Sequence, residues 1–128
     1  MDEKVKYWLE MSDYDLVTAQ SMLDSKRYLY VGFMCHQTVE KIFKALFLFR
    51  KNETPPLIHN LSMISQKGEF YNEFSDSQKD FIDELEPLNI EARYPIHKEK
   101  IFKMLTEAKC NDLLIKTREL QEWVKTKL

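Results

Sequence analysis

The chain has few of the residues that build tight turns, covalent cross-links or metal sites. Its 128 residues include only two glycines, four prolines and two cysteines. Gly32 and Gly68 are isolated from each other, which excludes a phosphate-binding glycine-rich loop. Cys35 and Cys110 have no cysteine or histidine at zinc-ligand spacing. We therefore expect two buried thiols, no metal site and no bound cofactor.

Long apolar runs are also absent. No run approaches the roughly 18 residues that a membrane span requires. The N-terminal sequence MDEKVKYWLEMSDYD is acidic and amphipathic, unlike a secretory signal. We therefore expect a soluble, cytoplasmic protein that makes no membrane contact.

The chain also lacks a large excess of charge of one sign. Its 19 basic residues nearly balance its 21 acidic residues, so the net charge is −2. That balance argues against a surface generally attracted to nucleic acid. The distribution is uneven. Glu40 is the one acidic residue among the charged residues of 26–51, and Lys79 is the one basic residue among those of 69–91. The basic segment is either a solvated helix face or a local site for a ligand that carries phosphate.

What the chain does contain is apolar residues at helical spacing. It is 44% hydrophobic and 31% charged, which is typical of one globular domain over residues 1–128. Apolar residues recur every three or four positions, which predicts helices over about residues 3–24, 29–51, 60–66, 76–88 and 98–127. The last of these is one helix or two. The fold class is therefore all-α, an up-and-down bundle of four long helices plus a short extra helix.

Several residues predict where these helices begin and end. Pro55 and Pro56 require a loop over residues 52–59. Asn60 is expected to cap the short helix, and Ser75 with Gln78 forms a capping-box pattern. Pro95 breaks the chain again, and Asn111-Asp112 is the expected break within the last segment.

A polar stripe interrupts the apolar helix expected over residues 29–51. Gln37, Glu40, Lys41 and Lys44 share one face at i, i+3, i+4 and i+7 spacing. One interpretation is structural, with Glu40 and Lys44 paired across one turn and Lys41 solvated. The other is a functional polar site.

Arg93-Tyr94-Pro95-Ile96-His97 forms a second polar group. Arginine can bind a phosphate through two hydrogen bonds, and histidine can act as a general acid or base near neutral pH. Alternatively, Arg93 pairs with the acidic helix, Tyr94 packs in the core and His97 caps the last helix. His59, just after the proline pair, is expected to order its loop rather than perform chemistry.

An ordered series of motifs resembles the HEPN domain family (higher eukaryotes and prokaryotes nucleotide-binding) over residues 8 to about 124. The motifs are Trp8, Ser12-Asp13-x-Asp15-Leu16, Gln37-x-x-Glu40-Lys41-x-x-Lys44-Ala45, His59-Asn60-Leu61 and Arg93-Tyr94-Pro95. The resemblance implies a helical bundle that is commonly a homodimer. It also implies one of two functions, because members of the family divide into two groups.

One group resembles stand-alone proteins that partner a minimal nucleotidyltransferase, as a two-component complex or toxin–antitoxin pair. The other consists of metal-independent ribonucleases with an arginine, four to six residues and then a histidine. Arg93 and His97 are separated by only three residues, so the resemblance favours the first group. The alternative is a ribonuclease toxin that uses Arg93 and His97 to cleave RNA.

For the favoured group, the resemblance implies a nucleotide-binding site. Its residues would be Gln37, Glu40, Lys41, Lys44, His59, Arg93 and Tyr94. Lys41, Lys44 and Arg93 would contact phosphate, and the others would order them. The implied partners are a second copy of the chain, a minimal nucleotidyltransferase protein, and a nucleotide or RNA.

Overall fold

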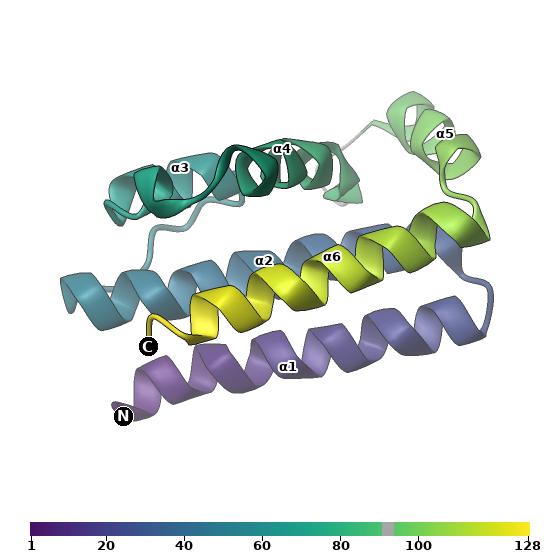
Figure 1. Cartoon of the computed structure of the whole chain (residues 1–128). Helices are drawn as coiled ribbons and strands as arrows, with labels where there is room; N and C mark the ends of the chain where they lie inside the picture. Colours follow the sequence, from purple (N-terminus) through teal and green to yellow (C-terminus); the bar gives the residue numbers. More distant parts are fainter. Residues whose placement is uncertain (91–93) are drawn as a thin grey trace.

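The computed structural model of the chain describes residues 1–90 and 94–128 (Figure 1). These residues form helices and connecting segments, with no strand among them. The elements are α1 (Glu3–Asp24), α2 (Tyr28–Lys51), α3 (Leu61–Lys67), the 3-10 turn η1 (Tyr71–Glu73), α4 (Asp76–Leu85), the 3-10 turn η2 (Glu86–Leu88), α5 (Pro95–Met104) and α6 (Glu107–Lys125). The predicted all-α bundle is confirmed.

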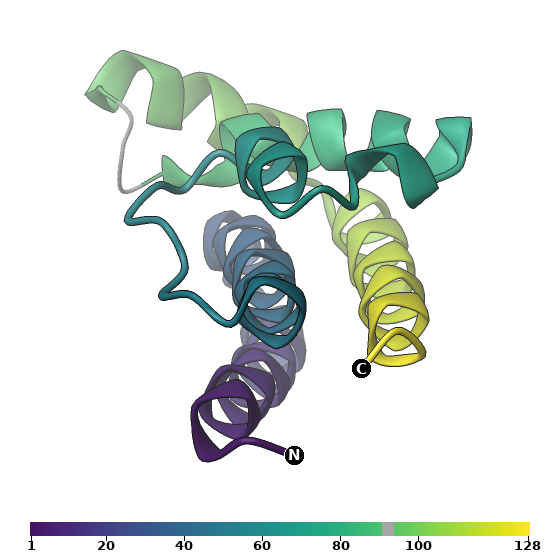
Figure 2. The same ribbon diagram turned by 90° about the vertical axis from the view of Figure 1, so that its left-hand side faces the viewer.

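Three long helices form the body of the fold. α1 runs antiparallel to α2, and α6 packs against both of them (Figure 1). Figure 2 shows these three helices nearly end-on, with the shorter helices lying over them. α2 is the central helix, because 14 of its 24 residues are buried. Any polar side chain on the inner faces of α2 must therefore find its partner within the protein.

Side-chain caps fix most of the helix starts. The Asn60 side chain accepts the Met63 N–H at the start of α3. Ser75 and Gln78 form the predicted capping box of α4. α2 ends at Asn52, which adopts the left-handed conformation with φ of 53° before the proline loop. These ends agree with the sequence prediction to within one or two residues.

The predicted break at Asn111-Asp112 is wrong, because both residues lie inside α6. The chain breaks instead at Leu105, which is 5% exposed and adopts an extended conformation. The Thr106 side chain accepts the Lys109 N–H and so starts a new helix. Burial of Leu105 and this cap together divide the last segment.

Pro95 also differs from its expected role. It occupies the first turn of α5 rather than a loop before the helix. Proline is favoured there, because the first-turn N–H groups have no partner within the helix. α5 therefore begins three residues earlier than the predicted Lys98 and continues the chain as a helix.

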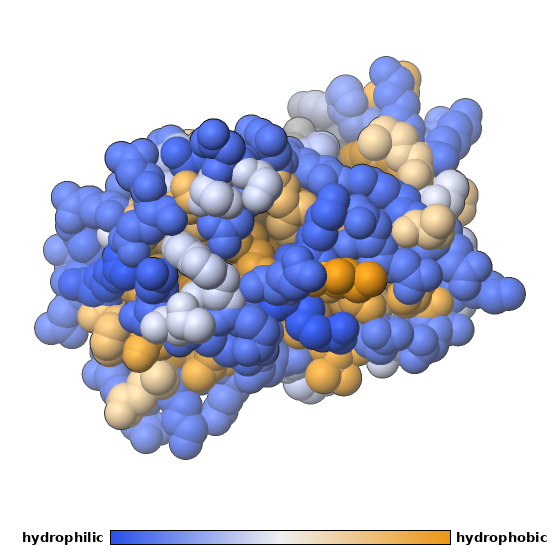
Figure 3. All heavy atoms as spheres, viewed as in Figure 1, coloured by the Kyte–Doolittle hydropathy of each residue, from blue (hydrophilic) through white to orange (hydrophobic). Residues whose placement is uncertain are grey.

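α5 stands at one end of the molecule (Figure 1). Ile101 is its one buried residue, whereas Ile96, Phe102 and Met104 are more than half exposed. In Figure 3 apolar atoms emerge in patches on an otherwise hydrophilic face. No helix in the described part of the chain is long and apolar enough to cross a membrane.

Candidate functional site

A buried carboxylate is the centre of the candidate site. Glu40, in the middle of α2, is 4% exposed. Lys44 Nζ donates a hydrogen bond to Glu40 Oε2 over 3.0 Å. His59 Nδ1 lies 3.2 Å from Oε1 and 3.0 Å from Oε2, and His36 Nδ1 lies 3.8 Å from Oε1. We call these four residues the Glu40 cluster.

The cluster combines helical periodicity with a loop contact. His36, Glu40 and Lys44 are spaced by one turn each, so they share a face of α2. The proline loop brings His59 from outside α2 onto the same carboxylate. A carboxylate only accepts hydrogen bonds, so His59 Nδ1 must carry the proton in this contact. The His59 side chain is 63% exposed, which leaves Nε2 available to a ligand or to solvent.

Lys44 also joins the cluster to a pocket. Its ammonium lies 5.6 Å from the centre of the Trp8 ring. Trp8 lines a pocket of about 530 Å³ between the start of α1 and the end of α2. The pocket is also lined by Asp2, Glu3, Lys4, Tyr7, Leu48, Asn52, Glu53, Thr54 and Pro55. Its three carboxylates and one lysine favour a cationic group over a phosphate on this side of Lys44.

Lys41 points to a different element. Its ammonium pairs with Asp15 of α1, a carboxylate that is 4% exposed. The structural interpretation is therefore wrong in leaving Lys41 solvated, because α1 covers that side of α2. Gln37 is half-buried on the same helix. The expected pairing of Glu40 with Lys44 is confirmed.

The His59-Asn60-Leu61 motif fastens α3 to its surroundings. His59 contacts Glu40, and Asn60 caps the helix. The Leu61 N–H donates to Glu86 Oε1 over 2.6 Å, and the Leu61 side chain is fully buried. Glu86 thus places a negative charge at the start of α3, where free N–H groups and the helix dipole favour it. No sequence signal identified Glu86, whereas Asp15 stood within a motif of the resemblance.

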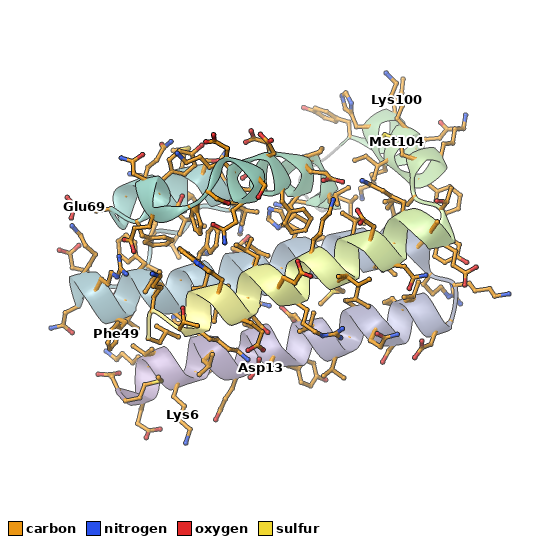
Figure 4. All side chains as sticks on the ribbon, in the orientation of Figure 1. Lys6, Asp13, Phe49, Glu69, Lys100 and Met104 are labelled. Atoms are coloured by element: carbon orange, nitrogen blue, oxygen red, sulfur yellow. The ribbon has the colours of Figure 1, made fainter. Side chains whose placement is uncertain are left out.

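A second polar network holds α1 to α6. Gln121 Nε2 donates to Ser12 Oγ and to Asp13 Oδ1, each over 3.0 Å. Lys125 Nζ donates to the same Asp13 oxygen over 2.8 Å. Figure 4 labels Asp13 on α1 in the space between the two helices. These bonds hold the two long helices in position.

The Arg93-Tyr94-Pro95-Ile96-His97 segment is described only in part, because Arg93 lies outside the described residues. Tyr94 is 78% exposed, so the alternative in which it packs in the core is wrong. His97 is also exposed, and its backbone N–H donates to the Tyr94 carbonyl over 2.9 Å. Both side chains are accessible to a ligand on the first turn of α5.

Two further features limit the chemistry of these residues. Among the described residues, no group of three histidine, cysteine, aspartate or glutamate side chains could hold a metal ion. Cys35 and Cys110 are both buried, as predicted. Burial raises the pKa of Cys35 to about 12 and that of Cys110 to about 11, so neither thiol is a ready nucleophile.

Comparison with known proteins gives one family and one solved structure. The sequence model of the HEPN domain matches residues 5–127. The crystal structure of TT1696 from Thermus thermophilus is similar, with a TM-score of 0.82 and 19% identity over 99% of this chain and 100% of that one. At that identity the likeness shows the fold alone. No match was found among curated proteins.

Proposed function

Because the chain belongs to the HEPN domain family, we propose that it is a non-catalytic partner subunit of a small nucleotidyltransferase. In this role it contributes nucleotide or substrate binding within a two-component, toxin–antitoxin-like system. The observation that carries the proposal is that the charged residues of the α2 motif form ion pairs within the protein. Lys41 pairs with Asp15, and Lys44 pairs with Glu40. These pairs tie α2 to α1 and hold the Glu40 carboxylate in place, which supports a binding scaffold rather than a catalytic role for these charges.

The nucleotide contacts in this proposal depend on shared donors. An ammonium group has three N–H donors, so Lys44 can bind a phosphate oxygen while it keeps Glu40. Lys41 is 21% exposed at its side chain and can share its donors in the same way. Arg93 supplies a further charge for phosphate in this proposal, and Gln37, Glu40, His59 and Tyr94 order the site. His59 is the member of the Glu40 cluster that is most open to a ligand.

Calorimetric titration with ATP tests the nucleotide part of the proposal. We expect Arg93→Ala and Lys44→Arg to weaken binding, because the first removes a charge and the second moves one. Lys26→Ala is the control, since Lys26 is exposed and lies on the α1–α2 connection. If both site variants stay folded and bind ATP as the parent does, these residues are not the phosphate site.

Purification from the native host tests the partner part. We expect a small nucleotidyltransferase to co-purify in a fixed ratio, identified by mass spectrometry and sized by light scattering. Recovery of the chain alone, from cells that express such a transferase, would contradict the partner role.

The exposure of His97 favours a second candidate function, a metal-independent ribonuclease. In this reaction His97 takes the proton of a ribose 2′-hydroxyl, and the 2′-oxygen attacks the adjacent phosphorus while Arg93 stabilises the charge on the phosphate. The bond from phosphorus to the 5′-oxygen breaks, which leaves a 2′,3′-cyclic phosphate and a 5′-hydroxyl that takes its proton from solvent. We expect RNA cleavage that persists in EDTA and is lost in His97→Ala. Equal cleavage by His97→Ala would exclude this mechanism.

A further inference from the structure

A groove lies between α4 and α6, away from the Glu40 cluster. It encloses about 720 Å³. Its lining residues are Ser75, Ser77, Gln78, Asp80, Phe81, Glu84, Lys116, Glu119, Leu120 and Trp123. In Figure 3, which views this face, apolar atoms are visible between hydrophilic atoms of the two helices.

The floor of the groove is apolar and continuous with the core. Phe81 is 6% exposed and Leu120 3% exposed. The centre of the Trp123 ring lies 5.2 Å from that of buried Phe74, and Trp123 is partly buried. The Lys127 ammonium lies 4.7 Å from the centre of the Trp123 ring, so a partner helix would share this ring with Lys127. A well-supported aromatic and aliphatic floor is typical of surfaces that anchor apolar side chains of a partner.

The rim of the groove is acidic. Asp80, Glu84 and Glu119 line it together with Lys116. Glu84 is paired with Lys109, which leaves Asp80 and Glu119 as the lining carboxylates with no ion pair among the described residues. Lys116 is itself paired with Asp112 over 3.1 Å. Its pKa is raised by the hydrogen bond to Asp112, with smaller contributions from Asp112, Glu84 and Glu119 as neighbouring charges. The field in the groove therefore favours positive charge.

We propose that this groove is a docking site for a basic amphipathic helix of a partner protein. The apolar side of that helix packs on Phe81, Leu120 and Trp123, and its lysines or arginines meet Asp80 and Glu119. α4 has 10 residues and spans about 15 Å, so a partner helix of about three turns matches its length. The proposal requires neither nucleotide nor a nucleotidyltransferase, and it stands apart from the proposed function.

The chain's own basic helix does not fill the groove. α5 carries Lys98, Lys100 and Lys103, but Ile101 and the following Leu105 anchor it in the core. Figure 1 shows α5 at the end of the molecule where α6 begins, beyond α4, and no residue of α5 lines the groove. A helix from another protein is therefore the occupant that the charges favour.

Trp123 provides a direct reporter of binding. The chain has two tryptophans, so in a Trp8→Phe background the emission comes from Trp123 alone. The probe is a synthetic helix of about four turns with leucines on one face and lysines on the other. At physiological ionic strength we expect saturable binding with a change in Trp123 emission. A peptide of the same composition in scrambled order, and a leucine–glutamate helix, should bind at least about tenfold more weakly.

Charge reversal tests the position of the site. Asp80→Lys with Glu119→Lys should weaken binding of the leucine–lysine helix at least about tenfold. Glu10→Lys with Asp24→Lys is the matched control, since these exposed carboxylates line neither the groove nor the pocket beside Trp8, and their reversal changes the net charge equally. If the reversed variant does not fold by circular dichroism, Asp80→Asn with Glu119→Gln replaces it, and a weakening of a few fold is expected.

Three results would overturn the proposal. The first is equal binding of the scrambled peptide. The second is equal binding by the groove variants and the control pair. The third comes from sedimentation of the protein alone. If it self-associates and the Asp80 and Glu119 reversals make it monomeric, the occupant is a second copy of the chain.

Discussion

The imidazole Nδ1 of His59 lies 3.0 Å from Glu40 Oε2, so the loop after the proline pair is fastened to the middle of the central helix. The same oxygen accepts the hydrogen bond of Lys44. One buried carboxylate therefore joins the middle of α2 to the loop that follows it, 19 residues along the chain. The contact with Lys44 should contribute mainly to the stability of the fold, and the contact with His59 mainly to the order of the loop.

Replacement of Glu40 by leucine should strongly destabilise the fold. Lys44 is 7% exposed at its side chain, so its charge would lose its main partner in a place that water barely reaches. Breaking a buried pair by removing one partner costs about 3–5 kcal/mol. The free energy of unfolding, measured by urea denaturation, should fall by about that amount.

The double replacement Glu40→Leu with Lys44→Met is the control for that prediction. Apolar residues of similar volume often replace a buried ion pair at no net cost. Most of the stability lost in Glu40→Leu should therefore return in the double variant. If Glu40→Leu alone lowers the free energy of unfolding by less than about 1 kcal/mol, the ion pair of Glu40 and Lys44 behaves as a solvent-exposed pair.

His59→Ala should loosen the proline loop more than it destabilises the whole domain. The imidazole is largely exposed, so its removal leaves little unfilled volume. The loop loses its side-chain contact with α2, and limited proteolysis within residues 52–60 should become faster. Leu57→Ala is the matched control in the same loop, because Leu57 is 95% exposed. Equal cleavage of His59→Ala and the parent would mean that the prolines alone order the loop.

The start of α3 supports a separate prediction. Asn60→Ala removes the side chain that accepts the Met63 N–H, and such caps contribute about 0.5–2 kcal/mol. We expect a loss of stability in that range by thermal or urea unfolding. Asn72→Ala, at an exposed position in η1, should change stability by less than about 0.5 kcal/mol. Similar values for the two variants would contradict a capping role for Asn60.

The helix boundaries show which parts of the fold the sequence predicts well. α2 was expected over residues 29–51 and occupies Tyr28–Lys51. Its end is set locally, by the proline pair and by Asn52. The division of the last segment was misplaced because Asn111 and Asp112 have lower helix propensity than their neighbours. Burial of Leu105 and the Thr106 cap decided the outcome, and burial is a tertiary effect that a local pattern does not reveal.

The candidate site divides in the same way. Glu40 and Lys44 pair through helical spacing, which the sequence shows directly. The partners of Glu40 and Lys41 in other elements, His59 and Asp15, lie 19 and 26 residues away in the chain. Periodicity gives the face on which a side chain lies, but not which element covers it. The stripe on α2 was therefore predicted as one polar face, whereas the fold divides it between two neighbours.

The buried thiols predict how stability changes in alkali. Burial raises the pKa of Cys35 to about 12 and of Cys110 to about 11, whereas an unfolded cysteine titrates near about 8.5. The unfolded state therefore loses protons first as the pH rises. The resulting stability is fully present below about pH 8.5 and falls above it, by up to about 1.4 kcal/mol per pH unit for each thiol.

The Cys35→Ala and Cys110→Ala double variant separates this effect from the titration of other groups. Its free energy of unfolding should fall less steeply than that of the parent between about pH 9 and 11, when both are measured by urea denaturation at each pH. At neutral pH the parent thiols should react slowly with a disulfide reagent in the folded state and rapidly in urea, because the thiolate is the reactive form. Parallel pH profiles for parent and variant, or fast labelling of the folded parent, would show that the thiols reach solvent.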